Sequence, residues 1–347
     1  MTMSLVLLVM FALIVYVLQW LSKKNALNGV EYQREISKHL NAPDEPFKLI
    51  TTITNNSFRI IPFVSINERL TDEVFHSAKV YLLPRARLVR RVDVSLPLRG
   101  RYGFTGATIG GGDFLGLSQS DKWFSSKFEV VIHPRKAHGN YIDKVLGSFL
   151  GEISVKRFIM PDPILITGFN EYTGREPMKA ISWPQTLRSG KMMVKNYDFT
   201  TELTATVVVS LDFLSDKNDM LPVEMADLVE KCLSIAHTVC AELEKRKIKY
   251  EFYSNMVTSG SNGWDHVKEG SGSRHLSHIL EGLGRAMLFK AESLEKLTMR
   301  VAKSQKHMTD KATVFIIPNR EDMALQIIKQ SGKEIKMVSV ISADKHK

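Results

Sequence analysis

The stretch Ala205-Thr-Val-Val-Val-Ser-Leu211 decides how the last third of this chain is interpreted, because it is a continuous run of mostly β-branched residues. Such a run predicts a strand that is covered on both faces, as in a parallel sheet. A helical pattern follows from Pro222 to Lys247, with apolar residues recurring every three or four positions. Proline suits the start of a helix, and the basic residues Lys245–Lys247 suit the negative end of its dipole.

The same alternation of strand and helix continues through the rest of the sequence. It predicts strands at Lys249–Tyr253, Thr313–Ile317 and Lys336–Ile341, a Gly/Ser-rich loop reaching Gly272, and helices at about His275–Lys303 and Glu321–Gln330. We therefore predict a mainly parallel, doubly wound α/β domain over residues 201–347. Ligands of such sheets gather at the carboxyl ends of strands, which here are Asp212–Asp216, Ser254–Ser261 and Pro318–Asp322.

Residues 25–136 instead alternate with a period of two. The clearest alternation runs over Arg85–Tyr102, where even positions from Leu88 to Leu98 are mostly apolar and odd positions are mostly polar. This pattern predicts a strand with one buried face and one wet face, and several such strands predict a β-sandwich. The six arginines of this stretch are expected on the wet face, where they could meet phospholipid headgroups. No aromatic residues alternate with them, so nucleic acid is not an expected partner.

The N-terminal stretch Met3–Leu21 is almost wholly apolar. Nineteen residues in a helix span about 29 Å, which is enough to cross a bilayer core. A cleaved signal peptide would require basic residues before this run and a small-x-small cleavage site, and neither is present. We expect an uncleaved anchor over residues 1–24, in contact with membrane lipid. Because Lys23 and Lys24 follow the run, the soluble part is expected in the cytoplasm of a single-pass protein of the cell membrane.

Composition excludes several classes of protein. Of 347 residues, 44% are hydrophobic and 24% charged, which is typical of a globular chain rather than a disordered one. The 47 basic residues against 37 acidic ones permit contact with an anionic surface. Cys232 and Cys240 are too few for a disulfide framework, and about 12 Å would separate them along a helix, too far for one bond. Both are expected to be small core residues.

Several motifs follow one another in a specific order. Leu98-Arg-Gly-Arg-Tyr102, Gly112–Leu117 and Val130–Arg135 are followed by Phe169–Gly174 and by Ile181–Val194. The order resembles that of the domain of unknown function 58 family. The matching residues are Arg99, Gly100, Tyr102, Asp113, Gly116, Pro134, Glu171, Tyr172, Gly174, Trp183, Arg188 and Gly190. Asn170 and the pair Arg175-Glu176 depart from the family pattern.

The resemblance implies a membrane-anchored protein in which a β-sandwich precedes an α/β domain similar to the von Willebrand factor A fold. A connecting segment over residues 137–200 carries the family motifs. The resemblance also implies association with MoxR-type AAA+ ATPases and other membrane proteins, and it brings no enzymatic activity or cofactor. Within the motifs, Trp183 is expected mainly to hold the fold, with Arg188 and Glu171 as a buried ion pair. Contact with a partner is the alternative for these residues.

A von Willebrand A-type domain can hold a divalent cation through Asp-x-Ser-x-Ser after its first strand. The corresponding residues here are Asp212, Ser215 and Asp216, with Leu214 in place of the first serine. Arg320 stands where a later metal-binding aspartate could lie, and it could instead pair with Asp212 or Asp216. The site is therefore expected to be degenerate, with no metal bound.

Two other candidate sites are weaker. His275 and His278, with His266 nearby, are too few for a zinc site. Gly110–Gly112 lacks the Gly-Lys-Ser/Thr ending of a phosphate loop and is expected to form a bulge or turn. The expected function is thus that of a non-enzymatic, membrane-tethered adaptor. An extracytoplasmic, metal-dependent ligand-binding or adhesion protein is the alternative, and a hydrolase ranks third.

Overall fold

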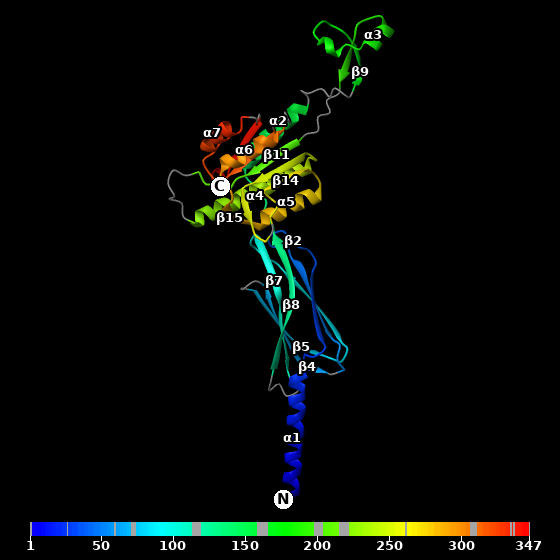
Figure 1. Cartoon of the computed structure of the whole chain (residues 1–347), viewed down its shortest axis with the longest axis vertical. Helices are drawn as coiled ribbons and strands as arrows, with labels where there is room; N and C mark the ends of the chain where they lie inside the picture. Colours follow the sequence, from blue (N-terminus) through cyan, green and yellow to red (C-terminus); the bar gives the residue numbers. More distant parts are fainter. Residues whose placement is uncertain are drawn as a thin grey trace. The chain divides into compact units, whose positions relative to one another are not determined.

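The computed structural model describes residues 2–25, 27–58, 60–70, 74–112, 119–157, 166–197, 204–214, 222–260, 262–305, 311–333, 335 and 337–346. These residues form two compact units, Met1–His133 and Pro134–Lys347, whose elements are labelled in Figure 1. The first unit begins with helix α1 (Thr2–Asn25). No helix among the described residues combines the length and the apolarity that crossing a membrane requires.

Two sheets form the rest of the first unit. The smaller has the order β1 (Val30–Ile36), β3 (Phe47–Asn55), β6 (Arg87–Val94). The larger has the order β2 (Leu40–Asn41), β8 (Gln119–Ile132), β7 (Gly100–Gly112), β4 (Ile61–Leu70), β5 (Val74–Leu82). Every pair of neighbouring strands is antiparallel except β2 with β8.

The core of the first unit lies between these two sheets. Ile53 of β3 packs in one cluster with Ile66 of β4, and Leu49 of β3 packs in another with Val130 of β8. Apolar side chains from one face of each sheet are thus buried against each other, as in a β-sandwich. The predicted sandwich is confirmed.

The predicted single strand Arg85–Tyr102 is divided between the two sheets. Strand β6 ends at Val94 and β7 begins at Gly100. Pro97 has no backbone N–H to donate to a neighbouring strand. Gly100 has φ 154°, a backbone conformation that residues other than glycine rarely adopt. The chain therefore changes sheets here, and Leu98, predicted to be buried, is exposed.

A charged group lies inside the sandwich. Arg34 of β1 and Glu68 of β4 are both buried, and their Nη2 and Oε1 atoms lie 3.2 Å apart. The same Glu68 oxygen accepts hydrogen bonds from Thr51 Oγ1 at 2.7 Å and from the Tyr32 hydroxyl at 3.1 Å. Burial is the main cause of a raised pKa at Tyr32, and the nearby negative charge of Glu68 raises this pKa further. The sequence pattern did not indicate this cross-sheet pair.

The second unit is built on a five-stranded sheet. Its order is β14 (His266–Gly270), β12 (Lys249–Ser254), β11 (Thr204–Val209), β16 (Ala312–Ile317), β17 (Met337–Ser342). The four strands from β12 to β17 are parallel, and only the edge strand β14 is antiparallel. The chain is therefore a multi-sheet α/β protein with a β-sandwich-like region and a mostly parallel sheet.

Helices cover both faces of this sheet. The helices are α2 (Asn140–Arg157), α4 (Pro222–Lys245), α5 (Ser273–Arg285), α6 (Leu294–Gln305) and α7 (Glu321–Ser331). Val208 and Phe315 pack with residues of α6 and α7 in one cluster. Their neighbours Val207 and Val314 point to the other face and are also fully buried. Buried Cys232 and Cys240 of α4 confirm the prediction that both are core residues, and burial raises the pKa of each thiol.

Two predicted segments of this unit are divided differently. The predicted Gly/Ser-rich loop contains β13 (Met256–Thr258) and the edge strand β14. The predicted long helix is two helices, α5 and α6, separated by β15 (Ala286–Lys290). Strand β14 pairs with β12 and β15 pairs with β13. Each added strand is five residues long and lacks an alternating buried face, so sequence periodicity does not report it.

The segment over residues 137–200 consists of two parts. Helix α2 packs against β16 and β17 and is therefore part of the α/β domain built on the five-stranded sheet. The second part, residues 166–197, is called the hairpin module. Its strands β9 (Ile166–Glu171) and β10 (Met193–Tyr197) are antiparallel, and the segment between them holds the short helices η1 (Met178–Ala180) and α3 (Trp183–Ser189). Figure 1 labels β9 and α3.

Candidate functional site

Asp212 follows β11 at the carboxyl edge of the parallel sheet, where a ligand site was predicted. Its side chain is buried, forms an ion pair with Lys290 of β15, and accepts a hydrogen bond from the Leu294 N–H at 2.8 Å. Leu294 is the first residue of α6, where the unpaired N–H groups of a helix favour a carboxylate. Asp212 thus connects the central strand to β15 and to α6.

Two asparagines connect the neighbouring loops of this edge. Asn255 donates to Ser210 Oγ at 3.1 Å and to the Glu292 carbonyl at 2.9 Å, and its Oδ1 accepts from the Leu211 N–H at 2.8 Å. Asn319 Oδ1 accepts from the Leu214 N–H at 3.1 Å. These two side-chain amides therefore satisfy the backbone N–H groups of Leu211 and Leu214 from within the chain.

Of the three predicted metal residues, the structure describes Asp212. Ser215 and Asp216 lie outside the described residues. Among the described ones, no group of three His, Cys, Asp or Glu side chains is arranged to hold a metal ion. The cation beside Asp212 is Lys290. The predicted Arg320 has Asp216 as its other expected partner, which lies outside the described residues, and the Arg320 backbone N–H donates to Asp344 at 3.2 Å. Lys290 lies 78 positions from Asp212, so no local pattern could have revealed it.

The three histidines considered for zinc each have another environment. His275 donates from Nε2 to the Tyr250 carbonyl at 3.0 Å, and burial lowers its pKa. His278 lies against the Trp264 ring, with centroids 5.5 Å apart, and His266 Nε2 lies 2.7 Å from Glu251 Oε1. Each of the three histidine side chains thus has a different protein partner.

A charged cluster that the sequence analysis missed surrounds Glu251 of β12. Lys311 Nζ lies 3.3 Å from Glu251 and 2.5 Å from Glu269, and the Tyr253 hydroxyl donates to Glu251 at 3.0 Å. Burial alone would raise the pKa of Glu251, but His266, Lys311 and Tyr253 outweigh it, so the net shift is downward. The pKa of Lys311 is raised, because Glu269 and Glu251 outweigh its own burial. The cluster fixes the edge strand β14 to the sheet.

The hairpin module carries the family-like motif residues in an exposed setting. Ala180, Ile181 and Val194 form its small buried cluster, and Tyr172 packs against it. Trp183 is 62% exposed and Arg188 is exposed, so Trp183 does not have the buried role expected for it.

The expected buried pair of Arg188 and Glu171 is not formed. Glu171 pairs instead with Lys191 at the surface of the module. Gly174 and Gly190 have φ 86° and 70°, which explains glycine at both turns. The motif residues of the module are therefore close in the chain but do not converge on one buried site.

The motif residues of the sandwich are structural neighbours of one another. The Tyr102 hydroxyl donates to the Leu98 carbonyl at 2.9 Å, across the turn that contains Arg99 and Gly100. Asp113 and Gly116 lie outside the described residues. Gly110 lies inside strand β7, not in the predicted bulge or turn, and a Cβ there would come within 2.0 Å of Gln119.

In the second unit, the Pro134 carbonyl accepts a hydrogen bond from His237 Nδ1 of α4 at 2.7 Å. This motif residue thus anchors the start of the second unit to a helix of its sheet.

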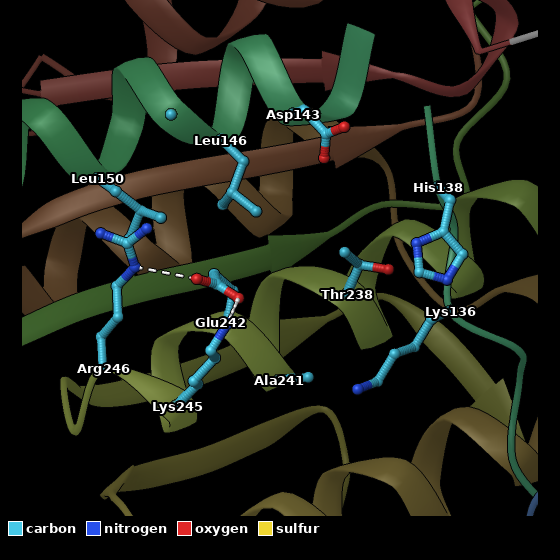
Figure 2. Close-up of a pocket in the computed structure, with 11 residues that line it drawn as sticks. Lys136, His138, Asp143, Leu146, Leu150, Thr238, Ala241, Glu242, Lys245 and Arg246 are labelled. Carbon is cyan, nitrogen blue, oxygen red and sulfur yellow. Dashed lines mark hydrogen bonds and ion pairs between the residues drawn. The ribbon is translucent and has the colours of Figure 1, made fainter. Parts of the chain in front are cut away.

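A groove between α2 and α4 is the cavity that Figure 2 shows. Its volume is about 590 Å³, with Leu146 and Leu150 on one wall. Arg246 and Glu242 form an ion pair at 3.1 Å on the opposite side. Lys136 also faces the groove, so cations and carboxylates are mixed around it, and no nucleophile is paired with a base.

Comparison with known proteins assigns no family. No protein-family model and no curated protein matches the chain. The CARDB domain of the PF1109 protein from Pyrococcus furiosus is 11% identical, with a TM-score of 0.24, over 30% of this chain and 93% of that chain. The sporulation control protein Spo0M from Bacillus subtilis is 10% identical, with a TM-score of 0.21, over 42% and 58%. Similarities this low support no inference about activity or partners.

Proposed function

We propose that this chain is a non-enzymatic, membrane-tethered adaptor that docks a MoxR-type AAA+ ATPase for the assembly or remodelling of membrane or envelope proteins. The observation that carries the proposal is the exposure of Trp183 and Leu187 on the hairpin module, at 62% and 85%. Large apolar side chains that lie together in solvent mark surfaces that bind another molecule, and these two are one helical turn apart on α3. They lie within the motifs that resemble the domain of unknown function 58 family.

The tether is proposed from the apolar sequence Met3–Leu21 and from the exposure of its side chains, although no helix among the described residues meets the length and apolarity that crossing a membrane requires. The segment lies within the continuous helix α1, in which nearly all apolar side chains between Val6 and Val17 are exposed. Lipid would cover such a surface, whereas water does so only at the cost of its hydrophobic free energy. The lysines Lys23 and Lys24 favour a cytoplasmic position for the units that follow.

The α/β unit supports an adaptor more than a metal-dependent binding protein. A central β11, a mainly parallel sheet and one antiparallel edge strand are compatible with the von Willebrand A-like assignment. At the carboxyl edge, Lys290 supplies a cation beside Asp212, and its charge would repel a divalent metal. Docking through such a domain would then not depend on magnesium.

The experiment is a pull-down of the tagged full chain from native membranes, with ATP or ADP, followed by mass spectrometry. Enrichment of an AAA+ ATPase with ATP and not with ADP is expected. A matched chain with Tyr81→Ser, a change at an exposed apolar residue of the sandwich, should capture the same ATPase. Recovery of envelope proteins alone would favour the extracytoplasmic alternative instead.

Membrane orientation is tested separately. Protease added to intact cells should spare both units if they are cytoplasmic, and should degrade them once the membrane is permeabilised. Degradation in intact cells would contradict the proposal, because an AAA+ ATPase requires cytoplasmic ATP.

A further inference from the structure

We infer that the exposed apolar side chains of η1 and α3 form the docking surface for the ATPase, seated in an apolar groove with acidic rims. The docking surface is defined by Met178, Trp183 and Leu187. This inference rests on the proposed function and adds the surface and the chemistry of the partner.

The hairpin module cannot bury these side chains itself. Helix α3 contributes no buried residue, and the small cluster of the module is built from Ala180, Ile181 and Val194. Trp183 and Leu187 are four positions apart, so they lie on the same side of α3. Trp183 is of a residue type enriched in interface hot spots, because Trp anchors fill desolvated pockets, and Leu187 extends the apolar surface beside it.

Charge selects among possible occupants. The module has five cations, Arg175, Lys179, Arg188, Lys191 and Lys195, against Glu171 and Glu176. Both carboxylates already have partners, since Glu171 pairs with Lys191 and Glu176 accepts from Thr173. Within the described part of the chain, the other four cations make no ion pair. The surface is therefore complementary to an acidic partner, and like charges disfavour a second copy of this chain.

The shortness of α3 favours a protein groove over a bilayer surface. Helices that lie in a membrane interface carry an apolar face along several turns, whereas α3 has seven residues and one Trp–Leu pair. Two anchors of this size suit a pocket of matching shape.

The test measures binding between the purified full chain, held in nanodiscs of neutral lipid, and the purified MoxR-type ATPase of the same organism, with ATP present. Trp183→Ala combined with Leu187→Ala should weaken binding at least about tenfold, the loss typical of interface hot spots. Met287→Ala combined with Phe289→Ala, which changes exposed apolar residues of β15, should leave binding unchanged. Arg188→Glu should weaken binding and reduce its dependence on salt, since it replaces a positive surface charge with a negative one and so lowers the attraction to an acidic partner.

Each outcome decides a different statement. If the unchanged chain does not bind the ATPase, the proposed function and the docking surface both fail. If the chain binds but the double variant and Arg188→Glu bind equally well, only the docking surface is overturned. Because Arg188 is exposed, Arg188→Glu remains informative even if the double variant unfolds. Trp20 of the tether is quenched by brominated phosphatidylglycerol in every variant, so the decisive quantity is the additional quenching that Trp183 contributes. Additional quenching in the unaltered chain that is lost with Trp183→Ala would assign the surface to lipid and overturn the inference.

Discussion

The buried carboxylate of Asp212 pairs with the ammonium group of Lys290, 78 positions further along the chain. The pair lies at the carboxyl edge of the parallel sheet, where the sequence predicted a degenerate metal site. A side chain of the protein thus provides the positive charge beside Asp212. The fold holds this edge together through Lys290 and the N–H of Leu294.

Lys290→Ala should lower the free energy of unfolding by about 1–2 kcal/mol, because the buried carboxylate of Asp212 loses its charge partner. The value is modest because the Lys290 side chain is 46% exposed and partly screened by solvent. Chemical denaturation would measure it. Lys296→Ala, at an exposed lysine of α6, is the control and should change stability by less than about 0.5 kcal/mol. Equal effects of the two variants would contradict a role for the pair.

Magnesium should not change the melting temperature of the unaltered protein, because Lys290 disfavours a second cation beside Asp212. A ligand that binds only the folded state would raise that temperature in proportion to its affinity. Thermal denaturation with increasing magnesium checks this, with Asp212→Ala as the control that lacks the carboxylate. A rise of several degrees in the unaltered protein alone would show that the edge binds metal.

Arg34→Met should destabilise the sandwich by up to about 3–5 kcal/mol, since it removes the closer of two cations from buried Glu68 and leaves Arg90 at 3.9 Å. Changing Glu68 to Gln as well should recover part of the loss, because the carboxylate that has lost its closer partner is then removed. Urea unfolding, with hydrogen exchange in β3 as a report on this unit, measures both.

The matched control is Lys38→Gln. Lys38 pairs with Glu45 at 2.8 Å, but both side chains are exposed, so the loss should stay below about 1 kcal/mol. A loss as small as this for Arg34→Met would mean that water reaches the buried pair.

The α/β unit should lose stability in acid through Glu251. Its pKa is lowered from the ordinary value of 4.5, so its stabilising contribution is complete above that value. The contribution is lost as pH falls through the lower, folded-state pKa. Glu251→Gln should cost about 1.5–3 kcal/mol at neutral pH, because hydrogen bonds to a charged group are lost, and it should flatten the decline in acid.

Urea unfolding between pH 7 and pH 3 checks this dependence. The exposed Glu295 of α6 serves as the control, since Glu295→Gln should leave the pH profile unchanged. A profile for Glu251→Gln as steep as that of the unaltered protein would place the acid sensitivity elsewhere.

Glycines in two helices should respond to alanine in opposite directions. A Cβ at Gly282 of α5 would come within 2.3 Å of Trp264, so Gly282→Ala should cost about 1–3 kcal/mol through overpacking. A Cβ at Gly151 of α2 meets nothing within 4 Å, so Gly151→Ala should stabilise by about 0.5–1 kcal/mol. Thermal unfolding distinguishes the two, and destabilisation by both would mean that α2 is more closely packed than its surroundings indicate.

Much of the fold was predictable because its signals are local. The β-branched run at Ala205–Leu211 and the apolar stripe of α4 report burial directly, and the structure places both in the core. The break at Pro97 was also visible in the sequence, yet the alternation on either side of it concealed the change of sheet. Strands β14 and β15 escaped prediction because both are only five residues long and neither shows the alternation of buried and exposed positions that marks a strand in sequence.

The sequence by itself determined the β-sandwich, the mainly parallel sheet and the core positions of Cys232 and Cys240, because the periodicity of apolar residues decides which faces are buried. Only the tertiary structure decided that Lys290 meets Asp212, that Arg34 meets Glu68, and that Trp183 remains exposed. These relationships depend on the register and packing of segments far apart in the chain. No local pattern of residues encodes that geometry.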